Sequence, residues 1–297
     1  MAAIVVAVAA PRSARAQACC AGAAAVTPGR LALHESMLVG VDARVTDGYG
    51  SYDPTGTFLT MPAGTSEVDL EQDVFGAIRV LPRGQVALLV PMIETRRAVP
   101  GEDAFGGGVG DINLGVRYDF VYATESRHVP GIAVLAGVTV PTGTPPESAT
   151  STLATDATGI GAYQANLGIA VEKVFDRWLV GATGLVAKRT TRDVDGVSEA
   201  LAAQWSGLLA VAYTLSGDTS LAVSGSVTSE GEARIDNMSS VGTHRRLVAI
   251  SVGGATSITD RVRVQAAVTF DPPIGSFGEN QPVAGVGVAG TLIFAWL

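Results

Sequence analysis

The sequence is poor in charged and aromatic residues and contains no long apolar segment. Of its 297 residues, 16% are charged and 6% aromatic, while 47% are hydrophobic and the mean hydropathy is +0.33. Disorder requires low hydrophobicity and high net charge, so the chain is expected to fold. The nearest candidate for a membrane helix, 200–217, is interrupted by Gln204, Ser206 and Thr214, whereas such a helix needs about 20 apolar residues. An apolar chain without this helix is typical of a transmembrane β-barrel, whose strands are apolar on one face only.

Positive charge, cysteine and histidine are also scarce. Twenty Lys and Arg stand against 28 Asp and Glu, for a formal net charge of −8. Nucleic acid is therefore not expected as a partner, because phosphate binding needs a basic face. The two cysteines, Cys19 and Cys20, are adjacent, and His34, His128 and His244 are scattered. This pattern fits neither a disulfide framework nor a metal site, and we predict no metal and no other cofactor.

The N-terminus has the pattern of an export signal. Residues 4–10 are apolar and precede two overlapping small-x-small cleavage sites that end at Ala16 and Ala18, although residues 1–3, before the apolar stretch, contain no Lys or Arg. We predict a signal peptide over 1–18, a periplasmic lead-in over 19–30 and an outer-membrane barrel over 31–297. An Ala-rich tail is the alternative for the first segment. Cleavage after Ala18 would leave Cys19 first, where lipidation is conceivable.

Beyond residue 33, apolar and polar residues alternate with a period of two, which is the strand signal. We expect twelve strands, at 34–46, 66–80, 85–98, 109–122, 130–141, 159–174, 178–192, 198–215, 219–230, 245–258, 261–271 and 283–297. A soluble β-sandwich would show the same alternation. The connections favour a membrane barrel, because long and short ones alternate, as loops and turns do at the two ends of an outer-membrane barrel. Pro91 interrupts the third strand, where we expect a bulge.

The predicted fold class is therefore all-β, a closed antiparallel transmembrane β-barrel of about twelve strands. An even strand number places both termini of the chain on the periplasmic side. In the cleanest run, 108–120, Ile112, Leu114, Val116 and Tyr118 share the face that we assign to lipid. Its other face carries polar residues and is assigned to the lumen.

The inward positions supply the candidate site residues, which would line the lumen. They are Asp42, Arg44, Asp69, Glu71, Asp73, Arg79, Asp111, Asn113, Arg117, Asp119, Glu172, Arg261, Arg263 and Gln265. Arg79, Arg117, Arg261 and Arg263 lie toward the short-turn end. Two interpretations remain open: these arginines set the charge preference of a conducting path, or acids neutralise them and the barrel is filled by ion pairs.

Two neighbouring motifs carry a family resemblance. Residues 108–118 read G-x-G-D-x-N-L-G-x-R-Y, and the next strand ends in V-x-V-P-T-G at 138–143. Both resemble strand motifs of the outer-membrane family named for the meta-pathway of phenol degradation, firmly over 105–145 and loosely elsewhere. The resemblance implies a barrel related to channels for hydrophobic or aromatic compounds. It brings no catalytic residue.

The expected function is the passive passage of small, apolar or aromatic solutes through the outer membrane. The expected partners are the bilayer and the solute, and the oligomeric state is left open. One alternative is a sealed structural or adhesive barrel that acts through its loops. A second is an outer-membrane lipid hydrolase, which would need a His–Ser pair on the lipid face. His34 and Ser36 share a face, but it is the inward face of Asp42 and Arg44, so we predict no enzyme.

Overall fold

The structure is a computed structural model and describes residues 29–297, except 195, 217 and 276. The predicted signal peptide, Cys19 and Cys20 lie outside these residues. Within the described part of the chain, no helix is long and apolar enough to cross a membrane. The helical element that it does contain is a single 3-10 turn, η1 (Pro146–Ser148).

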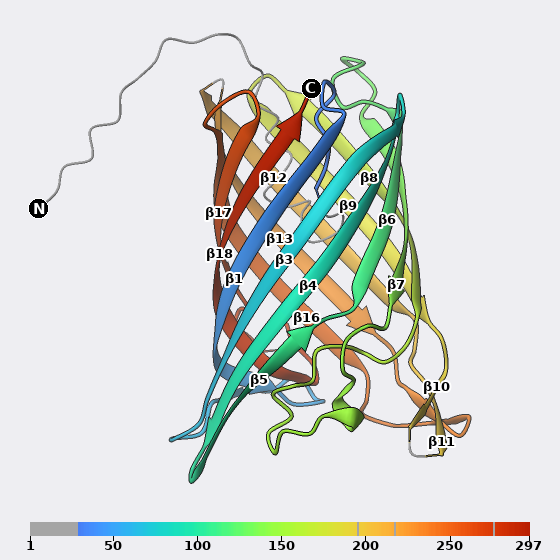
Figure 1. Cartoon of the computed structure of the whole chain (residues 1–297), viewed down its shortest axis with the longest axis vertical. Helices are drawn as coiled ribbons and strands as arrows, with labels where there is room; N and C mark the ends of the chain where they lie inside the picture. Colours follow the sequence, from blue (N-terminus) through green and yellow to red (C-terminus); the bar gives the residue numbers. More distant parts are fainter. Residues whose placement is uncertain (1–28, 195, 217, 276) are drawn as a thin grey trace, which may run out of the picture.

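Twelve antiparallel strands form a closed barrel (Figure 1), which confirms the predicted fold. They are β1 (Met37–Tyr52), β3 (Ser66–Leu81), β4 (Gly84–Val99), β6 (Ile112–Val121), β7 (Gly131–Val140), β8 (Gln164–Phe175), β9 (Trp178–Arg189), β12 (Gln204–Ser216), β13 (Thr219–Glu230), β16 (Arg245–Ser257), β17 (Val262–Phe270) and β18 (Gln281–Trp296). Each wall strand pairs with the next along the chain. The barrel closes where β18 pairs with β1, from Met37↔Trp296 to Tyr52↔Gln281.

Short and long connections lie at opposite ends of the barrel. In Figure 1 the C-terminus lies at the end with the short turns, and the larger loops gather at the other end. The loops carry β2 (Phe58–Thr60) and a separate sheet of β10 (Arg192–Val194), β11 (Val197–Ala200), β14 (Arg234–Ile235) and β15 (Met238–Ser239). The prediction that residues 99–108 form a loop is wrong. Pro100 and Gly101 form a tight turn there, and β5 (Glu102–Val109) pairs back onto β4.

The irregularity expected at Pro91 occurs in the facing strand. The β3–β4 pairing continues through Asp73↔Pro91 without a register shift. On the other side of β4, the strand pairing is interrupted at Gly110 and Asp111, which lie between β5 and β6. Pro91 has no N–H to donate on that side, but its carbonyl accepts a hydrogen bond from the Gly110 amide at 2.8 Å. Gly110 and Asp111 thus both lie opposite Pro91, which is the arrangement of a β-bulge, and the extra residue is on their strand.

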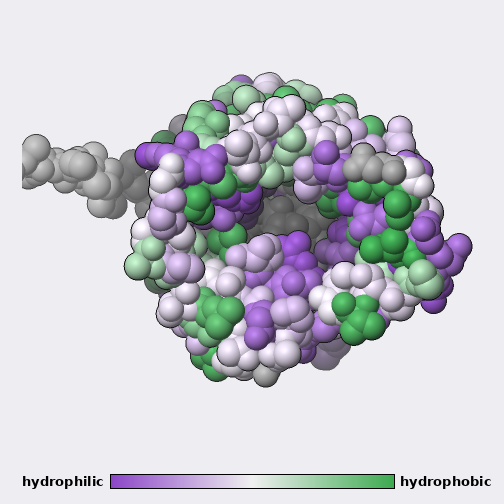
Figure 2. Space-filling model, turned by 90° about the horizontal axis from the view of Figure 1, so that it is seen from below, coloured by the Kyte–Doolittle hydropathy of each residue, from purple (hydrophilic) through white to green (hydrophobic). Residues whose placement is uncertain are grey.

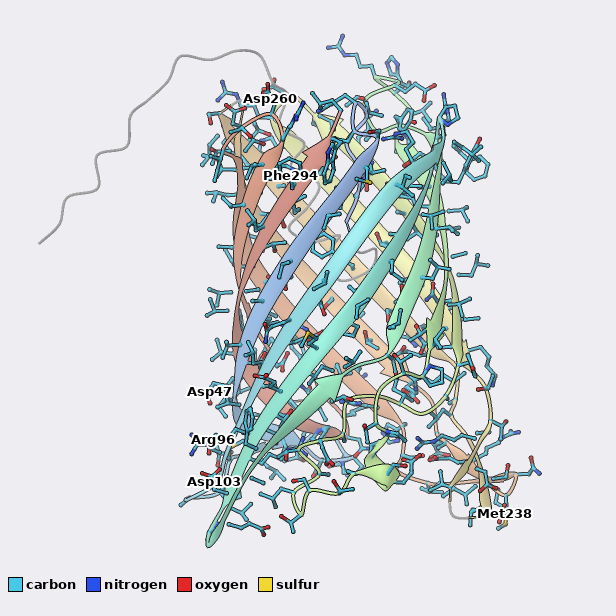
Figure 3. All side chains as sticks on the ribbon, in the orientation of Figure 1. Asp47, Arg96, Asp103, Met238, Asp260 and Phe294 are labelled. Atoms are coloured by element: carbon cyan, nitrogen blue, oxygen red, sulfur yellow. The ribbon has the colours of Figure 1, made fainter. Side chains whose placement is uncertain are left out.

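The outer face of the wall is apolar between two polar ends. On β6, Leu114 and Val116 are 48% and 44% exposed, whereas Arg117 and Asp119 are buried. Outward-facing rings pair at the short-turn end, with centroids 4.9 Å apart for Tyr118–Phe120, 4.7 Å for Trp178–Tyr213 and 4.6 Å for Phe294–Trp296. Charged side chains lie near the ends, as Figure 3 shows for Asp47, Arg96, Asp103 and Asp260. This distribution is typical of a barrel with a lipid-facing band and an aromatic girdle.

A glycine makes room for the largest apolar side chain inside the barrel. Phe75 on β3 is buried, and its cross-strand partner on β1 is Gly40. A Cβ at Gly40 would meet the Phe75 ring and would lie 2.9 Å from the Leu292 carbonyl oxygen. The ring therefore occupies the space that a side chain at position 40 would need.

We expect Gly40→Val to lower the free energy of unfolding by about 1–3 kcal/mol, because an extra side chain in a packed interior displaces its neighbours. Gly290→Val is the matched control, since no atom lies within 4 Å of a Cβ built there. Unfolding by denaturant measures the stability of both variants, with the loss of heat-modifiable migration in gel electrophoresis as the signal. Equal losses for the two variants would contradict this account of Gly40.

Candidate functional site

A cavity of about 580 Å³ lies in the lumen of the barrel. It is lined by side chains of the wall strands and by Gly29 and Arg30. Seen from the long-loop end, the barrel is hollow and hydrophilic residues surround the opening (Figure 2). The volume suits a small molecule, since ligand pockets commonly measure about 300–1,000 Å³.

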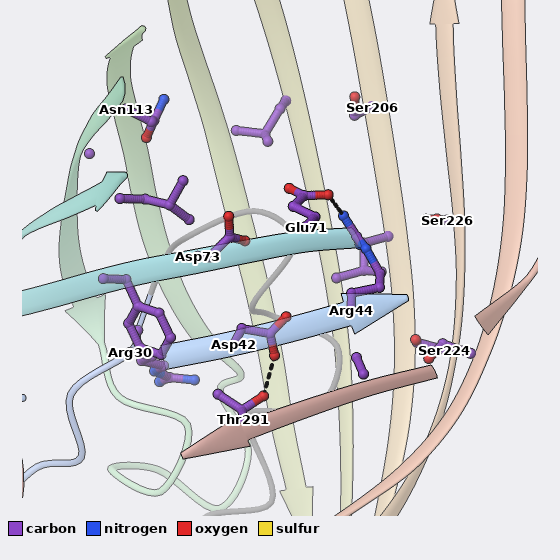
Figure 4. Close-up of a pocket in the computed structure, with 18 of the residues that line it drawn as sticks. Arg30, Asp42, Arg44, Glu71, Asp73, Asn113, Ser206, Ser224, Ser226 and Thr291 are labelled. Carbon is purple, nitrogen blue, oxygen red and sulfur yellow. Dashed lines mark hydrogen bonds and ion pairs between the residues drawn. The ribbon is translucent and has the colours of Figure 1, made fainter. Parts of the chain in front are cut away.

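One wall of the cavity is charged. Asp42 and Arg44 of β1 and Glu71 and Asp73 of β3 all line the cavity (Figure 4). Arg44 donates a hydrogen bond to Glu71. Asp42 accepts one at 2.5 Å from the Thr291 hydroxyl of β18. These four side chains occupy successive inward positions of two paired strands, which is why alternation brings them together.

The rest of the cavity wall is made of hydroxyl, carboxamide and apolar side chains. Its hydroxyl residues are Ser206, Ser224, Ser226, Ser251, Thr269 and Thr291. Its larger apolar residues are Phe75, Leu89, Leu135, Leu185, Leu208 and Ile293. Two further predicted site residues, Asn113 and Gln265, also line the cavity. The cavity can therefore contact an apolar body while its polar groups orient one end of it.

An inner segment, residues 29–36, occupies the short-turn end of the lumen. Gln85 of β4 is buried, and both the oxygen and the nitrogen of its carboxamide form hydrogen bonds with the backbone of this segment. The Leu31 amide donates to Gln85 Oε1 at 3.1 Å, and Gln85 Nε2 donates to the Gly29 carbonyl at 3.0 Å. Leu31 packs in a buried cluster with Leu38 and Phe75. Gly29 and Arg30, at the end of the predicted periplasmic lead-in, therefore lie in the lumen and line the cavity.

Glu35 fastens the other end of the inner segment. Its side chain is almost completely buried, accepts from the Ala32 amide at 2.7 Å and pairs with Arg263 of β17 at 3.1 Å. Arg79 of β3 donates to the carbonyl oxygens of Glu35 at 2.9 Å and Ala32 at 2.6 Å. Both predicted arginines therefore hold the backbone or the carboxylate of this segment.

A buried ion-pair cluster joins the inner segment to the opposite wall. Arg30 pairs with Glu172 of β8. Arg117 of β6 donates to Asp119 at 2.8 Å and to Glu172 at 3.4 Å. The side chains of all four residues are 4–12% exposed. Two cations and two anions thus neutralise one another inside the lumen, which supports the ion-pair interpretation at this depth.

The remaining predicted site residues lie away from the cavity. Asp69 of β3 accepts from the Thr95 hydroxyl at 2.6 Å. Asp111, between β5 and β6, accepts from the backbone amides of Gly143 at 3.0 Å and Ile160 at 2.8 Å, so it anchors the loop after β7. Arg261 is exposed in the turn before β17, because that strand begins only at Val262.

Sequence reasoning missed Arg30, Glu35 and Gln85, three residues that shape the lumen. Arg30 precedes the first predicted strand, where alternation has no predictive value. Glu35 falls inside that predicted strand, 34–46, but on the parity opposite Asp42 and Arg44, and the observed strand begins only at Met37. Gln85 lies at an inward position of the third predicted strand and could have been found by parity. The only signal for the inner segment was the presence of Arg30 and Glu35 in a short stretch beside Leu31 and Leu33.

The loop between β7 and β8, residues 141–163, folds against the projecting β4–β5 hairpin. Thr158 donates to the Val109 carbonyl at 2.9 Å, and Arg97 donates to the Leu153 carbonyl at 2.9 Å. Asp156 organises the loop itself, since it accepts from the Thr150 amide at 2.8 Å, the Thr150 hydroxyl at 2.7 Å and the Ser151 amide at 3.2 Å. These hydrogen bonds lower the pKa of Asp156 to about 2.

We expect these Asp156 hydrogen bonds to survive acidification to well below pH 4. Because the folded loop lowers the pKa, the ionised form stabilises it above the usual pKa of about 3.8, and this contribution disappears as the pH falls to about 2. Hydrogen exchange of the Thr150 and Ser151 amides should therefore stay slow at pH 4. In Asp156→Asn it should be faster at pH 7 and show no acid step between pH 4 and 2. Fast exchange at pH 4 in the wild type would contradict the assignment.

The residues weighed for catalysis are dispersed. Ser36 donates to the Trp296 carbonyl at 3.3 Å, and His34 is exposed beside it. His128 lies in the β6–β7 connection, and His244 lies near Glu279, with 3.6 Å between Nε2 and the carboxylate. Among the described residues, no three His, Cys, Asp or Glu side chains are grouped so that they could hold a metal ion.

Comparisons with known proteins agree with this architecture. A solved structure, the COG4313 outer membrane channel from Pseudomonas putida F1, superposes with a TM-score of 0.75 at 16% identity, covering 91% of this chain and all of that one. The translocator domain of the autotransporter NalP from Neisseria meningitidis gives a TM-score of 0.51 at 12% identity, over 93% and 92% of the two chains. Curated proteins give no match.

The first comparison supports the same fold, a twelve-stranded outer-membrane β-barrel. A family model matches residues 22–273, which is most of the chain, and it covers the two motifs at 108–118 and 138–143. Its description is "Putative MetA-pathway of phenol degradation". The chain belongs to this family.

Proposed function

We propose that this protein is an outer-membrane channel through which small apolar or aromatic solutes pass passively. The observation that carries the proposal is the cavity of about 580 Å³ in the lumen of a closed barrel, with much of its wall made of apolar and hydroxyl side chains. The likeness to the COG4313 outer membrane channel and the family's link to phenol degradation point the same way. The bilayer contacts the apolar outer faces, and the solute contacts the cavity.

Passage requires the inner segment to shift. Residues 29–36 stand between the cavity and the short-turn end, fastened by Gln85, Arg79 and Arg263. A solute can leave the cavity at that end only when these hydrogen bonds break. The two hydrogen bonds of Gln85 join neutral groups, and each typically contributes about 0.5–1.5 kcal/mol, which is less than the charged contacts of Arg79 and Arg263.

Influx of N-phenyl-1-naphthylamine into porin-deficient Gram-negative cells tests the proposal. This apolar aromatic dye fluoresces once it has passed the outer membrane. Cells that carry the protein should take it up faster than cells with the empty vector, and Gln85→Ala with Glu35→Ala should raise the rate further. The control is Arg83→Ala, which breaks an exposed ion pair with Glu125 in a turn. No influx above the vector level for any form would overturn the proposal in favour of a sealed barrel.

A further inference from the structure

None of the side chains directly opposite Asp73, or next to it on the same face of its strand, donates a hydrogen bond to it. Its cross-strand neighbours are Asp42 on β1 and Pro91 on β4. Its neighbours along the inward face of β3 are Glu71 and Phe75. None of these four side chains carries a hydrogen-bond donor when the acids are ionised. Asp73 Oδ1 is buried and has no hydrogen-bond partner among the described residues, although the Asp73 side chain lines the cavity.

The acids of the cavity outnumber the cations near them. The ion pairs at the short-turn end involve Arg30, which lines the cavity, and are balanced among themselves. The remaining charged lining residues are Asp42, Arg44, Glu71 and Asp73, with a formal net charge of −2. Arg44 already pairs with Glu71. Asp42 and Asp73 stand directly opposite each other on adjacent strands, an arrangement of like charges that destabilises a sheet.

We propose that the cavity binds small organic ammonium ions that carry an apolar body. This inference rests on the proposed channel function and names its preferred solute class. An ammonium group offers three donors and one positive charge, so it supplies a donor to the Asp73 carboxylate and relieves the repulsion between Asp42 and Asp73. Figure 4 shows both carboxylates directed into the cavity.

The apolar part of such a ligand has a place beside the acids. Phe75 follows Asp73 on the same face of β3, and Leu89 and Ile293 line the cavity as well. Ser224 and Ser226 also line the cavity, and their hydroxyl oxygens can accept hydrogen bonds from an ammonium group. An anion of the same shape would meet two carboxylates that have no ion-pair partner in the part of the chain that the structure describes, so the site discriminates by charge more than by shape.

Three ligands of one shape test the inference: benzylammonium, benzyl alcohol and benzoate. Binding is measured at pH 8 by equilibrium dialysis against the full chain in nanodiscs of zwitterionic lipid. We expect benzylammonium to bind at least tenfold more tightly than benzyl alcohol, and benzoate to show no saturable binding. Asp42→Asn with Asp73→Asn should bring benzylammonium to the level of benzyl alcohol and leave benzyl alcohol unchanged. Asp69→Asn is the matched control, because Asp69 is bonded to Thr95 and does not line the cavity.

The binding results test the preference for ammonium ions separately from the channel function. Equal binding of the three probes, no binding of any probe, a preference that persists in the double variant, or an equal loss in Asp69→Asn would overturn it. The wild-type probe series decides the matter even if the double variant does not fold. Influx of the neutral dye reports on the channel separately, so a channel without charge discrimination and a sealed barrel give different results.

Discussion

Arg117→Met is expected to lower the free energy of unfolding by about 3–5 kcal/mol, because it removes one partner from a buried ion-pair cluster. The Arg117 side chain is 4% exposed and pairs with Asp119 and Glu172. Methionine fills much of the volume without replacing the charge, so two acids would share Arg30 alone. Denaturant unfolding in detergent, followed by tryptophan fluorescence, measures the loss.

The control for Arg117 is an exposed ion pair of the same chemistry. Arg83 pairs with Glu125 in the turn region at 2.9 Å, and both side chains are more than a third exposed. Arg83→Met should cost about 0–1 kcal/mol, the usual value for a surface pair. If the two variants lose equal stability, the cluster around Arg117 contributes no more than a solvated pair does. Arg117→Lys keeps the charge and should recover part of the loss.

The wall of the barrel was predictable because each strand is long and has two chemically different faces. A period of two fixes which residues point outward, and a one-residue slip would put Asp42, Arg44 and Arg117 into lipid. The register is therefore strongly specified by the sequence at every wall strand. Even the exception at Pro91 follows from a missing donor, although the irregularity falls on the facing strand.

Alternation does not predict a segment that lies inside the barrel but is not part of the wall. Residues 29–36 have no period, so their place in the lumen depends on tertiary contacts with Gln85, Arg79 and Arg263. The same holds for ion pairing. Parity places Arg117, Asp119 and Glu172 on the inner face, but their convergence depends on barrel closure and on Arg30. For this reason the choice between free and neutralised arginines could be made only with the structure.

The contrast between Asp73 and Glu172 illustrates the limit on the candidate site. Both are acids on inward faces. Glu172 meets Arg30 and Arg117, whereas Asp73 lies between Asp42 and Pro91. The difference lies in which residues stand opposite in the neighbouring strands. That pairing depends on the register of three strands together, so a single strand cannot reveal it.

Leu114→Arg tests the assignment of the outer face to lipid and should cost about 2–4 kcal/mol, the value for a cation near the middle of the lipid-facing band of a barrel. Leu114 is 48% exposed, and its cross-strand neighbours Leu88 and Val138 are exposed apolar residues as well. In a folded wall surrounded by water, the same change would cost almost nothing. Reversible unfolding in phospholipid vesicles measures the loss.

Val241→Arg is the control for Leu114, because Val241 is 88% exposed in the loop between β13 and β16, beyond the wall strands. An arginine there remains in water, and the free energy of unfolding should change by less than about 0.5 kcal/mol. The decisive quantity is the difference between the two variants in vesicles. If Leu114→Arg is as mild as Val241→Arg, then β6 does not present that face to lipid, and the same doubt extends to Leu88 and Val138 beside it.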